Sequence, residues 1–64
     1  MVKVNGEVVD AKGKSVTELL IEEKYDEKRV VVEINEVIVP KKDYASVIIK
    51  DGDVIEIVSF VGGG

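Results

Sequence analysis

The chain ends in three glycines, and its terminal carboxylate is the first group that could take part in chemistry. Gly62, Gly63 and Gly64 carry no side chains for a core and lose the most backbone entropy when they are ordered. One interpretation is a frayed end or a cloning remnant. The other is that the Gly64 carboxylate enters a narrow site in another protein, which residues without side chains would fit. Four residues beyond Phe60 span at most about 13–14 Å when extended.

The other reactive side chains form no recognisable catalytic set. The sequence has no Cys and no His, which excludes disulfides, thiolate or imidazole zinc sites, and thiol or Ser-His catalysis. Asp51 and Asp53 flank Gly52, a pattern more typical of a turn than of a Mg²⁺ site. We therefore expect neither a metal site nor an enzyme active site.

Composition limits the classes of partner and of location. A chain of 64 residues is one small domain, and a net charge of -4 without a basic patch argues against nucleic acid and anionic membranes. No apolar run resembles a signal peptide or a membrane span, so we expect a cytoplasmic protein that is a monomer when free.

The first ten residues predict a β-hairpin. Apolar residues alternate on both sides of Asn5-Gly6, a dipeptide typical of the type I′ turn because both positions need a positive φ. The expected register pairs Val2 with Val9 on one face and Lys3 with Val8 on the other.

One helix is predicted over residues 16–24. Ser15 and Glu18 have the spacing of a capping box, and Val16, Leu19 and Leu20 form a short apolar stripe. Because two and a half turns are not stable alone in water, this helix must lie on a sheet.

Three further strands follow. Residues 29–35 predict a strand with Val31 and Glu33 on one face, and residues 37–39 a short strand that ends at Pro40. The last strand runs from Val54 to about Val61. Its alternation turns Ile55 and Ile57 toward the core and places Glu56, Val58 and Phe60 on the outer face.

This order of elements predicts an α+β roll, in which one helix packs across a mixed sheet of four to five strands. We expect a single domain over residues 1–61 and a flexible glycine tail over 62–64. On the outer face of the last strand, Val58, Phe60 and Val61 form the expected docking surface for a partner, and Val8 joins them if the hairpin lies alongside.

Several short motifs follow one another along the chain, and their order is informative. They are Val2-Lys3-Val4-Asn5-Gly6, Ser15-Val16-Thr17-Glu18-Leu19-Leu20, Ile34-Asn35, Ile38-Val39-Pro40, Asp51-Gly52-Asp53 and terminal Gly63-Gly64. In this order, and in a chain of this length, they resemble the ThiS-type sulfur carriers of thiamine biosynthesis, small β-grasp proteins related in fold to ubiquitin.

The resemblance implies a mechanism and a set of partners. A ubiquitin-activating-type adenylyltransferase would consume ATP and Mg²⁺ to adenylate the Gly64 carboxylate, while Gly62 and Gly63 thread into its site. A persulfide-bearing donor would then supply sulfur, and the resulting thiocarboxylate would pass it to thiazole synthase. In this interpretation the chain is a protein cosubstrate, not an enzyme, and binds no cofactor stably.

Three alternatives stay open at this point. Two share the fold: the small subunit of molybdopterin synthase, and a ubiquitin-like modifier joined through Gly64 to lysine amines. The third is a non-catalytic interaction module with an inert tail, which predicts no ATP-dependent chemistry and no effect of deleting Gly64.

Overall fold

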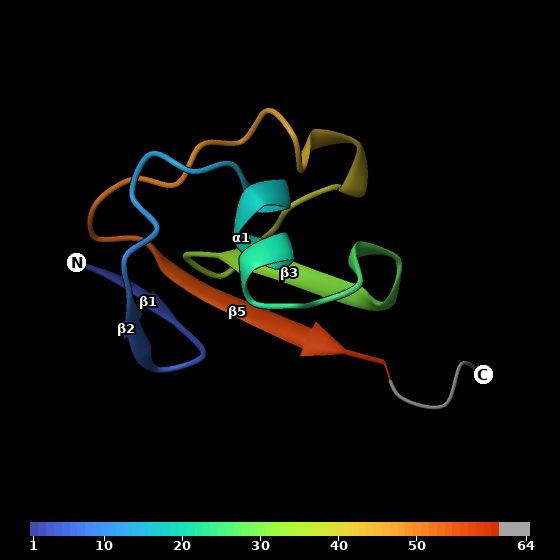
Figure 1. Cartoon of the computed structure of the whole chain (residues 1–64), viewed down its shortest axis with the longest axis horizontal. Coiled ribbons are helices and arrows are strands. Elements are labelled where there is room, and N and C mark those ends of the chain that lie inside the picture. The colour runs from blue at the N-terminus through green and yellow to red at the C-terminus, as the bar shows by residue number, and fades with distance from the viewer. Residues whose placement is uncertain (61–64) are drawn as a thin grey trace.

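A five-stranded mixed sheet and one α-helix make up the fold, and the computed structural model describes residues 1–60. The helix α1 spans Val16–Glu22, and two 3-10 turns, η1 and η2, span Glu27–Arg29 and Lys41–Asp43. The strands are β1 (Val2–Val4), β2 (Glu7–Val9), β3 (Val30–Ile34), β4 (Val37–Ile38) and β5 (Val54–Ser59). Their order in the sheet is β2-β1-β5-β3-β4 (Figure 1), with β1 and β5 parallel and the other pairs antiparallel. The predicted α+β roll is confirmed.

The N-terminal hairpin has the predicted register and turn. Val2 lies opposite Val9, and Lys3 lies opposite Val8. Asn5 has a φ of 50° and Gly6 a φ of 84°. These are the two positive φ angles that a type I′ turn requires.

The helix begins as predicted and ends two residues early. The Glu18 amide donates to Ser15 Oγ at 3.1 Å, and the Ser15 amide donates to the Glu18 carboxylate at 2.9 Å. At the other end Lys24 turns to a φ of 62°, and the Tyr25 amide donates to the Leu20 carbonyl at 2.9 Å. This is the Schellman pattern with lysine where glycine is usual, so the left-handed backbone at Lys24 stops the helix.

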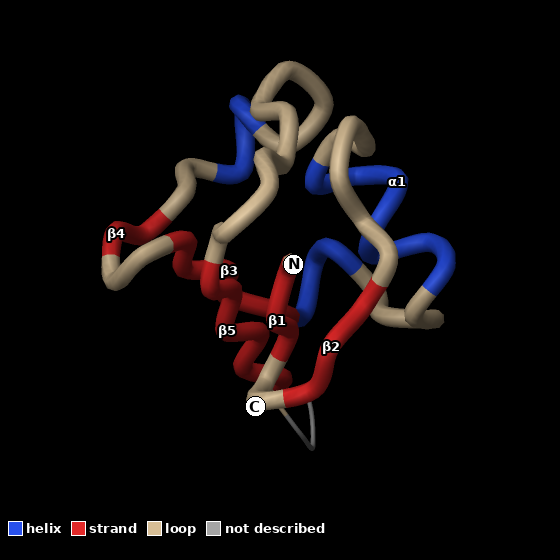
Figure 2. The backbone as a smooth tube through the Cα atoms, turned by 90° about the vertical axis from the view of Figure 1, so that its left-hand side faces the viewer, coloured by secondary structure: helices blue, strands red, loops and turns tan. Residues whose placement is uncertain are grey.

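The core lies between α1 and one face of the sheet. In Figure 2 the helix and the long connections lie on one side of the strands. Tyr44 is one of the largest buried side chains, at 2% exposed, although it lies just after η2 and outside any strand or α-helix. The other buried apolar residues are Val2, Val4, Ala11, Val16, Leu19, Leu20, Val30, Val32, Val39, Ile49, Ile55 and Ile57.

The second half of the chain supplies a second tight hairpin and the central strand. Asn35 and Glu36 join β3 to β4 with φ angles of 52° and 70°, so this turn has type I′ character without any glycine. In β5, Ile55 and Ile57 point into the core while Glu56 and its neighbours are exposed, as the alternation predicted. The domain boundary expected at residue 61 and the tail over 62–64 lie outside the described residues.

Burial of Tyr44 makes the stability of the fold depend on pH in the alkaline range. Burial raises the pKa of the Tyr44 hydroxyl, and a hydrogen bond with the Val32 backbone partly offsets that rise. The pKa of a tyrosine in an unfolded chain is about 10. The contribution of Tyr44 to stability is therefore complete below about pH 10 and is lost as pH rises through the higher folded pKa.

We predict that Tyr44→Phe weakens the fall in stability between pH 8 and pH 11, because phenylalanine has no hydroxyl to ionise. Urea unfolding at a series of pH values measures this fall. Parallel pH profiles for the parent chain and the variant would contradict the prediction.

Candidate functional site

The outer face of the sheet is the candidate functional surface. No segment of residues 1–60 crosses this face, whereas α1 and the long connections lie on the other side (Figure 2). Strand alternation and register determine which side chains point outward. These outer-face residues are Lys3, Val8, Val31, Glu33, Ile38, Val54, Glu56 and Val58.

The apolar part of this face lies where β5 ends. Val58 is 51% exposed and lies opposite the half-buried Val31 of β3. Phe60 follows the strand, is 57% exposed, and its amide donates to the Arg29 carbonyl at 2.8 Å. The predicted exposure of Val58 and Phe60 is therefore confirmed. The other predicted site residues, Val61, Gly62, Gly63 and Gly64, lie outside the described residues.

Val8 does not lie beside Val58. It is exposed and belongs to the outer face, but it lies opposite Lys3, and Lys3 lies opposite Val54 at the start of β5. Four residues of an extended strand, roughly 13 Å, separate Val54 from Val58. The hairpin does lie alongside β5, but the strand register places Val8 level with the start of β5 at Val54 and not with its end.

Two glutamates face each other in the middle of the outer face. Glu33 of β3 lies opposite Glu56 of β5 in the antiparallel ladder. Neither carboxylate forms an ion pair within residues 1–60, where the ion pairs join Met1 to Asp51, Lys14 to Glu22 and Arg29 to Asp26. Like charges directly opposite destabilise a sheet. Sequence alternation identified both residues as outward-facing, but only the register shows that they are neighbours.

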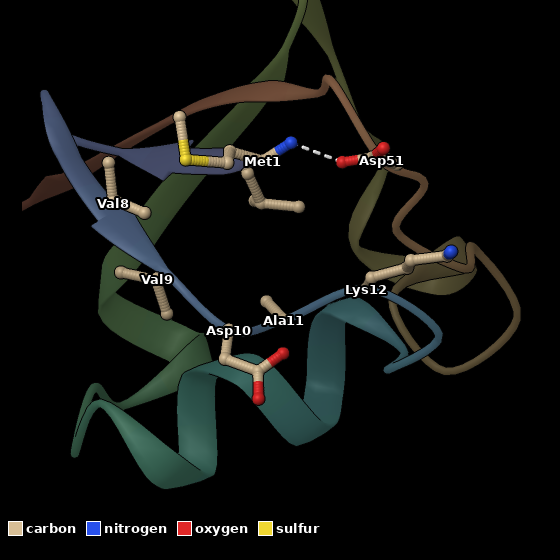
Figure 3. Close-up of a pocket in the computed structure, with 8 residues that line it drawn as sticks. Met1, Val8, Val9, Asp10, Ala11, Lys12 and Asp51 are labelled. Carbon is tan, nitrogen blue, oxygen red and sulfur yellow. Dashed lines mark hydrogen bonds and ion pairs between the residues drawn. The ribbon is translucent and has the colours of Figure 1, made fainter.

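A hollow in the described part of the chain lies away from the Val58–Phe60 end. It has a volume of about 470 Å³ and is lined by the start of β1, by residues 8–12 and by Asp51 (Figure 3). The N-terminal ammonium of Met1 is bonded to the Asp51 carboxylate, and this contact lowers the pKa of Asp51. These two charges pair with each other, and Asp10 and Lys12, which also line the hollow, form no ion pair within residues 1–60.

Within residues 1–60 the carboxylates are dispersed. No group of three or more Asp and Glu side chains is close enough together to hold a metal ion. The predicted turn at Asp51-Gly52-Asp53 is present, with Gly52 at a φ of 90° and both Asp53 oxygens bonded, one to the Lys50 amide and the other to Asn35. The helix, at seven residues, is too short to cross a membrane.

Comparison with known proteins gives consistent results for sequence and structure. Residues 1–64 match the ThiS family. The sulfur carrier protein ThiS of Bacillus subtilis is 44% identical over 66 residues, which cover all of both chains. A thiamine biosynthesis protein, ThiS, from Geobacter metallireducens has a crystal structure that superposes with a TM-score of 0.79 at 37% identity, covering 98% of this chain and 97% of that one.

A much longer protein also contains a similar segment. The thiazole synthase of Paramagnetospirillum magneticum is 45% identical over 62 residues, which are 95% of this chain. The chain spans 19% of the length of that protein.

The opposed glutamates predict that neutralising either one stabilises the free chain. Glu33→Gln or Glu56→Gln should raise the free energy of unfolding by about 0.2–1 kcal/mol at low salt, because the repulsion across the ladder is removed. The gain should shrink as added salt screens the charges. Urea unfolding at two salt concentrations measures it. Glu23→Gln, on the helix side, is the matched control and should have no comparable effect.

Proposed function

This chain belongs to the ThiS family, and we propose that it is a sulfur carrier of thiamine biosynthesis whose Gly64 carboxylate becomes a thiocarboxylate. The observation that carries the proposal is the match with a Bacillus sulfur carrier over the whole of both chains. The fold supports it, because β5 leads the chain out of the sheet at Phe60 beside an uncovered face. Four residues then remain before the terminal carboxylate.

The proposed chemistry begins with activation of a poor acyl donor. A Gly64 carboxylate oxygen attacks the α-phosphorus of ATP in a partner adenylyltransferase, and pyrophosphate leaves. The terminal sulfur of a persulfide then displaces AMP from the acyl carbon and forms an acyl disulfide. A thiol cleaves the S–S bond of that acyl disulfide, which leaves the thiocarboxylate on Gly64 and a disulfide on the donor side. We propose that these steps take place in the cytoplasm.

In this scheme the chain is a cosubstrate and the partner supplies catalysis. The sequence contains neither Cys nor His, the residues on which thiol and Ser-His catalysis depend. What the chain contributes is binding and delivery: the outer face docks, and Gly62 and Gly63 pass through a narrow opening to the reacting carbon. ATP and Mg²⁺ bind to the partner, and this chain holds no cofactor of its own.

We propose thiazole synthase as the acceptor of the sulfur. A protein with that name contains a segment 45% identical to this chain over 62 residues. A carrier-like segment on the same polypeptide as its acceptor would raise the local concentration of each for the other. That arrangement supports a transfer between this chain and a separate thiazole synthase.

Intact mass tests the central step. The chain is incubated with ATP, a persulfide source and the adenylyltransferase of the same cell. We expect a mass gain that corresponds to replacement of one oxygen by sulfur, together with release of pyrophosphate. The same chain without Gly64 is the control and should show neither.

The outcome separates the carrier from the other interpretations. An unchanged mass, with the enzyme active on another carrier, would contradict the proposal. Conjugates between Gly64 and lysine amines would instead indicate a protein modifier, and sulfur accepted only by molybdopterin synthase would indicate the small subunit of that enzyme.

The docking role of the outer face predicts a loss of affinity without a loss of fold. Phe60→Asp should weaken binding to the adenylyltransferase about tenfold or more, because a buried apolar contact becomes a buried charge. Its free energy of unfolding should change by no more than about 0.5 kcal/mol, since Phe60 is exposed.

Ile21→Asp provides the matched control. Ile21 is 69% exposed on α1, which covers the opposite face of the sheet, and its substitution should leave affinity unchanged. Titration calorimetry measures both variants. Equal affinities for Phe60→Asp and the parent chain would exclude Phe60 from the interface.

A further inference from the structure

Asn5 bonds to β5 through its side chain at a point where the backbone of β1 has already turned away. The Asn5 amide donates to the Ile55 carbonyl at 2.9 Å, which is the last backbone bond between the β1 segment and β5 within residues 1–60. With its φ of 50°, Asn5 then turns the chain toward β2. Its side chain continues the ladder: Oδ1 accepts from the Ile57 amide at 2.8 Å, and Nδ2 donates to the Ile57 carbonyl at 3.2 Å.

A primary amide presents the same donor and acceptor as a peptide group, so the Asn5 side chain acts as one more residue of β1. The Nδ2 group also lies 3.4 Å from the Tyr25 hydroxyl, just after α1. One amide therefore connects the hairpin, the segment after the helix and the central strand.

The position of Ile57 makes these bonds relevant to the proposed function. Beyond Ile57 come Val58, Ser59 and Phe60, and the partners of this segment are on the β3 side: Val58 lies opposite Val31, Ser59 lies opposite Val30, and the Phe60 amide bonds to Arg29. Within the described residues, Ile57 is thus the last residue of β5 whose backbone is bonded on the β1 side, and only partners on the β3 side follow it.

We propose that Asn5 is a positioning residue for the carrier's reaction. Its side-chain amide fixes the C-terminal end of β5 along the β1 edge, and so fixes the direction in which the chain leaves the sheet toward Gly64. This role rests on the proposed function, because it assigns the bond to Ile57 a consequence at the reacting carboxylate. Small misplacements of a reacting group cost large factors in rate.

The chain contains a matched control in Asn35. This residue also follows a strand, has a φ of 52°, and binds β5 with its side chain: Oδ1 accepts from the Val54 amide at 3.0 Å. Its Nδ2 donates to Asp53 Oδ1 at 3.0 Å. The difference between the two asparagines is the place where they bind, since Asn35 bonds at the first residue of β5 and Asn5 bonds near the last.

The test compares Asn5→Gly with Asn35→Gly. Glycine accepts a positive φ without strain, so both turns persist and only the side-chain amide is lost. Both variants should lower the midpoint of urea unfolding. With the adenylyltransferase, ATP and a persulfide source, at a temperature where both chains are folded, Asn5→Gly should lower kcat for thiocarboxylate formation about tenfold while KM stays within about twofold. Asn35→Gly should leave both constants within about twofold of the parent values.

Asn5→Asp adds a second variant, because it keeps the acceptor for the Ile57 amide and replaces only the donor. The kcat of Asn5→Asp should lie between that of the parent chain and that of Asn5→Gly. Equal kcat values for Asn5→Gly and the parent, or an equal loss for Asn35→Gly, would overturn the positioning role.

Hydrogen exchange of the free chain gives a readout that does not depend on sulfur chemistry. Asn5→Gly should increase exchange of the Phe60 amide about tenfold more than exchange of the Leu19 amide, which bonds to the Ser15 carbonyl at the start of α1 and serves as the reference. Asn35→Gly should change the two amides in parallel. If the parent chain gains no sulfur, the proposed function fails, and the Phe60 exchange then decides whether Asn5 fixes the strand end. Parallel changes at Phe60 and Leu19 in Asn5→Gly would overturn that role.

Discussion

β5 is the last strand in the sequence and the central strand of the sheet, with β1 bonded to one edge and β3 to the other. The rest of the structure depends on this placement. Ile55 and Ile57 of β5 reach the core, which also contains residues of α1 and of both neighbouring strands. β5 pairs in parallel with β1, which lies near the opposite end of the sequence. The sheet is therefore complete only when β5 has been inserted between β1 and β3. Pairings across such long sequence separations form late and carry a high entropic cost.

Two asparagine side chains, Asn5 and Asn35, hold β5 in the sheet in equivalent ways. Each follows a strand that flanks β5, adopts a left-handed backbone, and bonds a β5 backbone amide through its side-chain oxygen. Asparagine suits both positions because it tolerates a positive φ and because its amide copies a peptide group. Lys24 and Glu36 show that the fold also accepts positive φ angles at residues that do not favour them, at a cost of order 1–3 kcal/mol each. The tight turns of this small domain are therefore maintained by packing as well as by residue preference.

The same strand divides core from surface. Because side chains alternate along β5, Val54, Glu56 and Val58 fall on the face that α1 does not cover. That face combines valines with the opposed Glu33 and Glu56, a like-charge contact that the free chain tolerates without an ion pair in its described part. The proposed role as a carrier needs such a surface more than it needs a pocket, since in that proposal a partner supplies the catalysis.

Local sequence determined the elements of this protein, and only the tertiary structure decided how they meet. The Asn5-Gly6 turn, the capping box of Ser15 and Glu18, and the alternation of β5 follow from φ preferences, short-range hydrogen bonds and side-chain periodicity, which act within a few residues. The sequence also carried the resemblance to sulfur carriers, which the comparisons support over residues 1–64.

The early end of α1, the location of Val8 away from Val58, the opposition of Glu33 and Glu56, and the bond from Asn5 to Ile57 could not be predicted in this way. The last three each concern two residues that lie 23 to 52 positions apart along the chain. Strand order and register fix them, and those depend on how the whole core packs. A shift of one residue in register would turn every side chain of a strand to the other face.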